Sequence, residues 1–258
     1  MKGNTTMKKK ILAMCLCVAM LAIAIVGGTL AYFTDTDEAT NTFTTAKVNI
    51  ALNEQQRGEN GLEAFENEKV LYPIVGSAQG EKDEMGMPTA ANYIDKIITI
   101  KNLEDSTDAY VRLYIAIPSV LDNVGNAGMN VLHFNWGNNF ETGEYTVEDY
   151  KNWGAETLLV QDFNIDGINY NIYYRDYNKV MEADTETGSA AYVGFYMDAN
   201  VDYDNENGYY TINGEEIEYD FSNGVNIPVF AVGVQEAGFD TAADAVTAAF
   251  GADFNPFN

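Results

Sequence analysis

The stretch AYVRLYIAI, residues 109–117, alternates between small or branched apolar side chains and larger or polar ones. Successive side chains of a β-strand point to opposite faces, so this two-residue repeat predicts a strand with one face in the core. Pro118 follows and lacks the amide hydrogen that a further ladder bond needs. The expected core face consists of Val111, Leu113, Ile115 and Ile117.

Similar patterns surround this strand. Ile94, Ile98 and Ile100 share one parity just before it, and residues 191–201 alternate after it. Asp-Gly and Asn-Gly dipeptides suit the type I′ turns of β-hairpins, and they occur at residues 166–167 and 213–214. The hairpins that these turns predict pair residues 158–165 with 168–177, and residues 209–212 with 216–219.

Residues 227–234 are apolar on both faces, which is typical of a central strand. Residues 241–250 predict the one clear helix, with Thr241 or Asp240 as its cap and Gly251 at its end. Short strands separated by turns predict an all-β protein, an antiparallel sandwich with a short C-terminal helix.

Two segments break the strand pattern. Residues 53–92 are rich in glycine and acids, and predict a long irregular insertion with one short strand at residues 70–75. Residues 123–154 are rich in Gly and Asn, and Thr146 with Asp149 predicts a short capped helix there.

The N-terminus has the composition of an export signal. Three lysines at residues 8–10 precede an apolar run at residues 11–26, and a Gly-Gly pair precedes the small-residue site at Ala31. Cleavage is therefore expected between Ala31 and Tyr32. The alternative is a retained membrane anchor, but the apolar run is slightly short for a bilayer. A lipoprotein site at Cys15 would lie too early in the run. The predicted organisation is a signal peptide (1–31), a donor or first strand (32–52) and a β-sandwich domain (53–258).

The chain is strongly acidic, with a net charge of −25. Removal of the signal leaves 10 basic against 39 acidic side chains, a net charge of −29. Such a protein repels nucleic acid and anionic lipid, so no nucleic-acid partner is expected, and a membrane is contacted only through the uncleaved signal. Self-association should be opposed at low salt and eased by screening. Cys15 and Cys17 both lie in the signal, so the mature chain has no disulfide.

The junction GGTLAYFTDTDEATNTFTTAKV, residues 27–48, resembles the signal sequences of the TasA/camelysin family, Gram-positive exported proteins processed by a SipW-type signal peptidase. The similarity continues at residues 98–115, ITIKNLEDSTDAYVRLYI, and at residues 229–250. The resemblance implies a jelly-roll-like sandwich, localisation in the extracellular matrix or at the cell surface, and assembly into biofilm fibres. The implied partners are the signal peptidase, further copies of the chain and related matrix subunits.

Physical reasoning also favours assembly. Cleavage leaves a Thr-rich N-terminal strand whose backbone groups need a partner, and adding it to a neighbour's sheet edge is β-augmentation. The side chains expected to enter the neighbour's groove are Phe33, Phe43, Val48, Ile50 and Leu52. The alternative for residues 48–52 is a first strand within their own domain.

The sequence offers little for catalysis, so no enzyme activity is expected. The camelysin branch is described as metalloprotease, yet the mature chain has only His133 and no cysteine as nitrogen or sulfur ligands for zinc. A carboxylate pair for glycoside hydrolysis stays open. Asp202, Asp204 and Glu206 alternate in an acidic loop and are weak calcium candidates, without the glycine and glutamate of an EF-hand. No cofactor is expected beyond this calcium.

The sequence therefore predicts a secreted fibre subunit. A second hypothesis is a monomeric adhesin or carbohydrate-binding module, favoured by aromatic residues expected on the surface, and a third is a protease. The aromatic residues in question are Tyr173, Tyr192, Tyr196 and Trp136.

Overall fold

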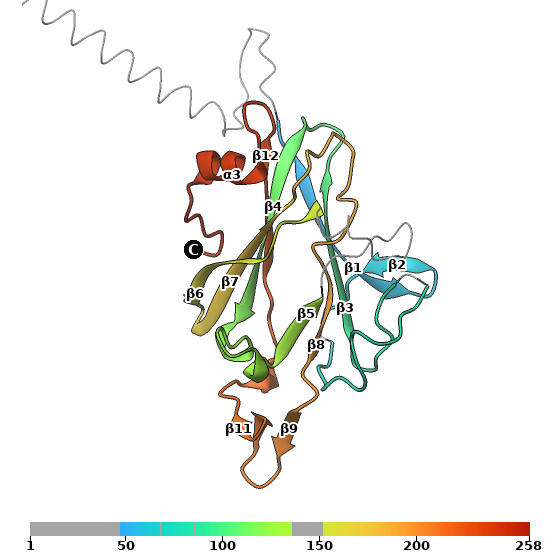
Figure 1. Cartoon of the computed structure of the whole chain (residues 1–258), viewed down its shortest axis with the longest axis vertical. Coiled ribbons are helices and arrows are strands. Elements are labelled where there is room, and N and C mark those ends of the chain that lie inside the picture. The colour runs from blue at the N-terminus through green and yellow to red at the C-terminus, as the bar shows by residue number, and fades with distance from the viewer. Residues whose placement is uncertain (1–46, 68, 85, 136–151) are drawn as a thin grey trace, which may run out of the picture. The chain divides into compact units, whose positions relative to one another are not determined.

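The computed structural model describes residues 47–67, 69–84, 86–135 and 152–258. These residues form three antiparallel sheets and one α-helix, so the mostly-β prediction is confirmed (Figure 1). The first sheet has the order β2-β1-β3-β8-β5, the second β12-β4-β7-β6, and the third, smaller one β11-β10-β9. The expected helix at residues 146–149 lies outside the described residues.

The strands of the first sheet are β1 (Ile50–Gly58), β2 (Gly61–Ala64), β3 (Ile94–Asn102), β8 (Tyr192–Met197) and β5 (Leu132–Asn135). The second sheet contains β12 (Val229–Gln235), β4 (Ala109–Pro118), β7 (Ile168–Asp176) and β6 (Thr157–Ile165). The small sheet consists of β11 (Glu215–Glu216), β10 (Tyr209–Ile212) and β9 (Val201–Asp204), and the helix is α3 (Ala242–Phe250). Single 3-10 turns occur at Ser119–Leu121, Ala127–Met129 and Phe221–Asn223.

The main core lies between the first two sheets. Ile94, Ile98 and Ile100 of β3 pack there together with the odd-numbered residues of β4, as their parity predicts. The even-numbered face of β4 is buried as well, because α3 and the C-terminal tail cover the outer side of this sheet. β4 is thus the strand around which both layers of the core are built.

Turn chemistry sets the two hairpins as expected. Asp166 and Gly167 have φ values of 50° and 92°, and Asn213 and Gly214 have 51° and 86°. Two successive residues with positive φ are the signature of a type I′ turn, whose twist matches that of the flanking strands. Thr241 caps α3 by accepting a hydrogen bond from the Asp244 amide, and the helix ends before Gly251.

The prediction of a central strand at residues 227–234 is wrong. Among the described strands, β12 pairs only with β4 and therefore forms an edge of its sheet. Its two apolar faces have another cause. Val232 and Val234 pack under α3, whereas Val229 and Ala231 pack on the main core. A covering helix produces the same sequence pattern as a second neighbouring strand.

The prediction of an irregular segment from residue 53 is also wrong in its first part. β1 continues to Gly58 and turns back into β2 at Gly61, which has a φ of 121°. Polar residues such as Glu54 and Arg57 hid this strand, because their side chains form ion pairs with Lys96 and Asp95 instead of showing an apolar alternation. The rest of the segment is irregular as expected, but residues 70–75 form isolated bridges at Pro73 and Val75 rather than a strand.

Candidate functional site

One cavity is a groove that opens into the main core. Its volume is about 1080 Å³. β1, β3 and β8 supply one wall, the loop after β2 supplies the rim, and the loop at residues 221–228 with the start of β12 closes the far side. We call it the core groove. Its apolar lining comprises Leu52, Phe65, Val70, Leu71, Ile94, Phe195, Met197, Tyr210, Phe221, Val225, Ile227, Pro228 and Val229.

Two strand edges border this groove. The start of β1 lies against the end of β12, and the two strands diverge from there (Figure 1): a Cβ atom added to Gly233 would lie 2.8 Å from Val48 Cγ1 and 3.0 Å from Ile50 Cγ2. Further along, no strand of the described chain lies between them, since β2 pairs with β1 only from Gln55 onward. The distance between the two sheets therefore increases along this side, and the core groove lies where the sheets are apart.

The backbone of both edge strands has unused hydrogen-bonding groups. The Glu236 amide donates to Asp108 O and the Ala116 amide to Pro228 O, each at 2.9 Å, so the even-numbered residues of β12 bond with β4. Odd-numbered residues such as Ala231 and Gly233 consequently direct N–H and C=O groups away from β4, where the described part of the chain supplies no partner. By the same alternation, Ile50 and Leu52 direct theirs away from β3. An added strand could satisfy these groups.

Charged groups at the mouth of the core groove surround one aromatic ring. Lys96 Nζ lies 4.6 Å and Lys69 Nζ 5.9 Å from the centroid of Phe65. Lys96, whose side chain is only 9% exposed, forms an ion pair with Glu54 at 2.7 Å. Composition alone did not single out these residues, because Lys96 lies within a predicted strand, between Asp95 and Ile97, and Lys69 lies in the irregular segment.

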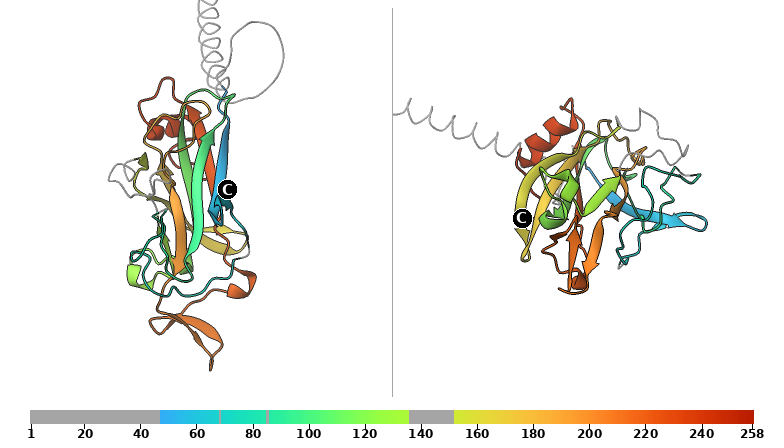
Figure 2. Two further views of the ribbon diagram at one scale, coloured as in Figure 1. Left: turned by 90° about the vertical axis from the view of Figure 1, so that its right-hand side faces the viewer. Right: turned by 60° about the horizontal axis from the view of Figure 1, so that its bottom comes forward.

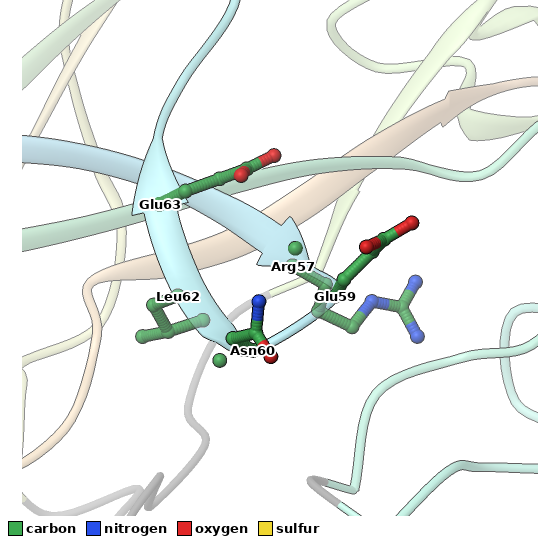
Figure 3. A pocket seen from close by; sticks show the side chains of 7 residues that line it. Arg57, Glu59, Asn60, Leu62 and Glu63 are labelled. Carbon is green, nitrogen blue, oxygen red and sulfur yellow. The ribbon is translucent and has the colours of Figure 1, made fainter.

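The hollow at the turn between β1 and β2 is a different kind of feature. Figure 3 shows the Arg57 side chain directed away from Leu62 and Glu63. Arg57 donates to Asp95 and Asp83, each at 2.8 Å, and to the Pro88 carbonyl at 3.1 Å. Although burial alone lowers the pKa of Arg57, the hydrogen bonds to the two carboxylates raise it. These bonds tie the end of β1 to Asp95 of β3 and to Asp83 and Pro88 of the irregular segment, so Arg57 has a structural role at this hollow.

The calcium candidates lie on the small sheet, which projects beyond the sandwich (Figure 2). Both carboxylate oxygens of Asp204 already accept hydrogen bonds within the turn that follows, from the Glu206 and Asn207 amides and from Asn207 Nδ2. The side chain of Asn207 is the main cause of the lowered pKa of Asp204. Asp202 accepts from the Tyr203 amide. Asp204 thus has a structural role in the turn.

His133 lies on β5, as a packed side chain at the edge of the first sheet. Its ring stacks on Tyr196 with 5.1 Å between centroids, and Nε2 lies 2.9 Å from Asp198 Oδ2. Within the described residues there is no group of three or more His, Cys, Asp or Glu side chains that could hold a metal ion. His133 therefore has one carboxylate neighbour rather than a ligand set.

The four aromatic residues expected on the surface differ in their exposure. Tyr192 is 1% exposed and hydrogen-bonds to Glu156, so its assignment to the surface is wrong. Burial is the main cause of its strongly raised pKa. Tyr173 faces the core and donates to Asp122 at 2.6 Å. Tyr196 is half-buried against His133, and Trp136 lies outside the described residues.

The predicted assembly residues divide into two groups. Ile50 and Leu52 pair with Asn102 and Ile100 of β3 and pack on the main core, so they belong to a strand of their own domain. Val48 lies against Gly233 of β12. The two aromatic residues Phe33 and Phe43, and the cleavage site at Ala31 and Tyr32, lie outside the described residues.

The geometry defines an antiparallel sandwich with an open, apolar side between two strand edges. Residues 6–57 match the model of the camelysin metallo-endopeptidase family, which confirms the TasA/camelysin resemblance over that stretch. The match ends within β1, so the groove walls formed by β3, β8 and β12 lie outside it. No curated protein and no solved structure matches the chain. In the described residues, no helix has the length and apolar character needed to cross a membrane.

Proposed function

We propose that this chain is an exported structural subunit of cell-surface or matrix fibres. A SipW-type peptidase removes residues 1–31, and the freed segment that begins at Tyr32 inserts into the core groove of another copy. The observation that carries this proposal is the groove itself, an opening into the main core between two edges with unpaired backbone groups. An inserted strand would bury the apolar lining and complete both sheets.

Head-to-tail insertion also explains how a polymer would grow. The donor segment and the groove consist of different residues of the chain, so the proposed contact is heterologous and propagates instead of closing. The family match over residues 6–57 covers the predicted cleavage site and the proposed donor segment, and so supports the resemblance from which the export route is inferred. A jelly-roll-like connection of the strands belongs to the same proposal.

The test is assembly from two N-termini. Protein starting at Tyr32 is compared with the same protein extended by several residues before Tyr32, by size-exclusion chromatography and negative-stain microscopy, with and without calcium. We expect filaments from the authentic N-terminus and none after deletion of residues 32–43. Monomers under every condition would refute the fibre function.

The family description names a metallo-endopeptidase, which makes proteolysis the competing function. We propose that this chain is not an enzyme, because His133 has Asp198 as its neighbour and the described residues form no larger ligand group around it. Casein hydrolysis by the pure protein, blocked by a chelator and absent in His133→Ala, would overturn this view.

A further inference from the structure

We propose that Lys69 and Lys96 make the core groove selective for an acidic extended segment, and that this segment is residues 32–44 of a second copy. This inference rests on the proposed function, since it specifies which chemistry the groove accepts. It assigns to the two lysines the recognition of the donor segment.

The charge of the groove differs from that of the rest of the molecule. The chain has a net charge of −25, yet the described residues that line the core groove include two lysines and a single acid, Glu54. Glu54 is already paired with Lys96, and Lys69 forms no ion pair within the described chain. Among its described lining residues, the groove therefore has one positive charge in excess, that of Lys69.

A second cavity shows the opposite composition. It has a volume of about 800 Å³ and lies between the 3-10 turn at Ser119–Leu121, the β6–β7 hairpin and the segment after β11. No lysine or arginine of the described ranges lines it, and its acids are Asp162, Glu216, Glu218 and Asp220. An acidic segment would be repelled there and attracted to the core groove, so charge alone distinguishes the two openings.

The N-terminal segment has the matching pattern. Residues 32–44 contain three acids and no base. In an extended strand Phe33, Asp35 and Asp37 have the same parity and point to one face, with Phe43 on that face as well. The face that presents aromatic rings thus also presents carboxylates. Five residues of strand span about 13 Å, so an aromatic ring and a carboxylate reach neighbouring parts of one groove.

Burial should make the pairing stronger than an exposed ion pair. Lys96 is held at the apolar groove wall, and an inserted strand would exclude water from the mouth where Lys69 lies over Phe65. The two copies repel each other at long range because both are acidic, and the lysines supply attraction only at contact. Selectivity therefore arises in the groove rather than during approach.

Charge reversal in the mature full chain, residues 32–258, tests this inference. Lys69→Glu should raise the critical concentration for assembly about tenfold, equivalent to 1.4 kcal/mol, and Asp35→Lys with Asp37→Lys should do the same. The triple variant combines Lys69→Glu with Asp35→Lys and Asp37→Lys. It exchanges the charges of groove and segment, and should recover most of the wild-type assembly. Lys179→Glu is the matched control, because it makes the same charge change at an exposed lysine that does not line the groove.

A labelled peptide of residues 32–44 separates the two proposals. Its binding to the mature chain is measured by fluorescence anisotropy, with Lys69→Glu and Lys179→Glu compared. If fibres form and the two variants behave alike, charge selection is refuted and the fibre function stands. If the wild type forms no fibres but binds the peptide in a Lys69-dependent way, selection is supported and the fibre function is refuted. If it neither forms fibres nor binds the peptide, both are refuted.

Discussion

Two apolar surfaces of the sandwich differ in whether the described chain covers them. On the second sheet, α3 and the C-terminal tail cover the even-numbered face of β4, and Ala245 and Val246 are fully buried there. Between β1 and β12 the described chain supplies no such cover, and the apolar lining opens into the core groove. One chain thus closes one apolar surface with its own C-terminus and leaves another available. The proposed strand insertion would give the open side the cover that α3 gives the other.

The largest expected effect tests how completely the closed side excludes water. Arg112 is 3% exposed, forms a two-point ion pair with Asp176 at 2.6 and 2.9 Å, and lies 4.0 Å from the centroid of Tyr174. Burial lowers its pKa, and the bonds to Asp176 more than offset this. Arg112→Ala leaves a carboxylate without its partner, so the free energy of unfolding should fall by about 3–5 kcal/mol.

Urea unfolding followed by circular dichroism measures this change. Lys179→Ala, at an exposed lysine, is the control and should lie within about 0.5 kcal/mol of the wild type. A loss below about 1 kcal/mol for Arg112→Ala would mean that water reaches the pair and that α3 does not seal the sheet.

A matched pair of valines compares the two sides directly. Val246 on α3 is fully buried, whereas Val229 at the start of β12 lines the open groove and is only partly buried. Val246→Ala should cost about 2 kcal/mol of monomer stability, and Val229→Ala about 1 kcal/mol or less, because less apolar area is lost from an open site.

The same pair should reverse its order in assembly. Val229→Ala removes lining that an inserted strand would cover, so it should weaken binding of the peptide of residues 32–44 more than Val246→Ala does. Equal effects of the two valines, on both unfolding and peptide binding, would show that the groove is no more open than the face beneath α3.

The sequence predicted the closed side better than the open one. The parity of β3 and β4, the two type I′ turns and the cap of α3 are local features, and local features can be read from neighbouring residues. The edge position of β12 could not be read in this way, because burial under a helix and burial between two strands give the same apolar run. The groove also escaped prediction. Its walls come from residues far apart in the sequence, and its key lysine, Lys69, lies in a segment without periodicity.

The smallest effect concerns the turn after β9, which is closed by polar bonds rather than by apolar cover. The pKa of Asp204 is lowered, chiefly by the side chain of Asn207, so the contribution of this carboxylate is present above its unfolded pKa of about 3.9 and is lost as pH falls through the lower folded value. NMR titration of the Glu206 and Asn207 amides should give a midpoint below about pH 3.9.

Asp204→Asn keeps an oxygen acceptor but no titrating charge, and should abolish that transition while the turn stays formed. A midpoint at or above the unfolded value would mean that the turn does not depend on the ionised carboxylate. Because the residue is exposed, the change should stay local, and the unfolding of the sandwich should be unaffected, unlike that of Arg112→Ala.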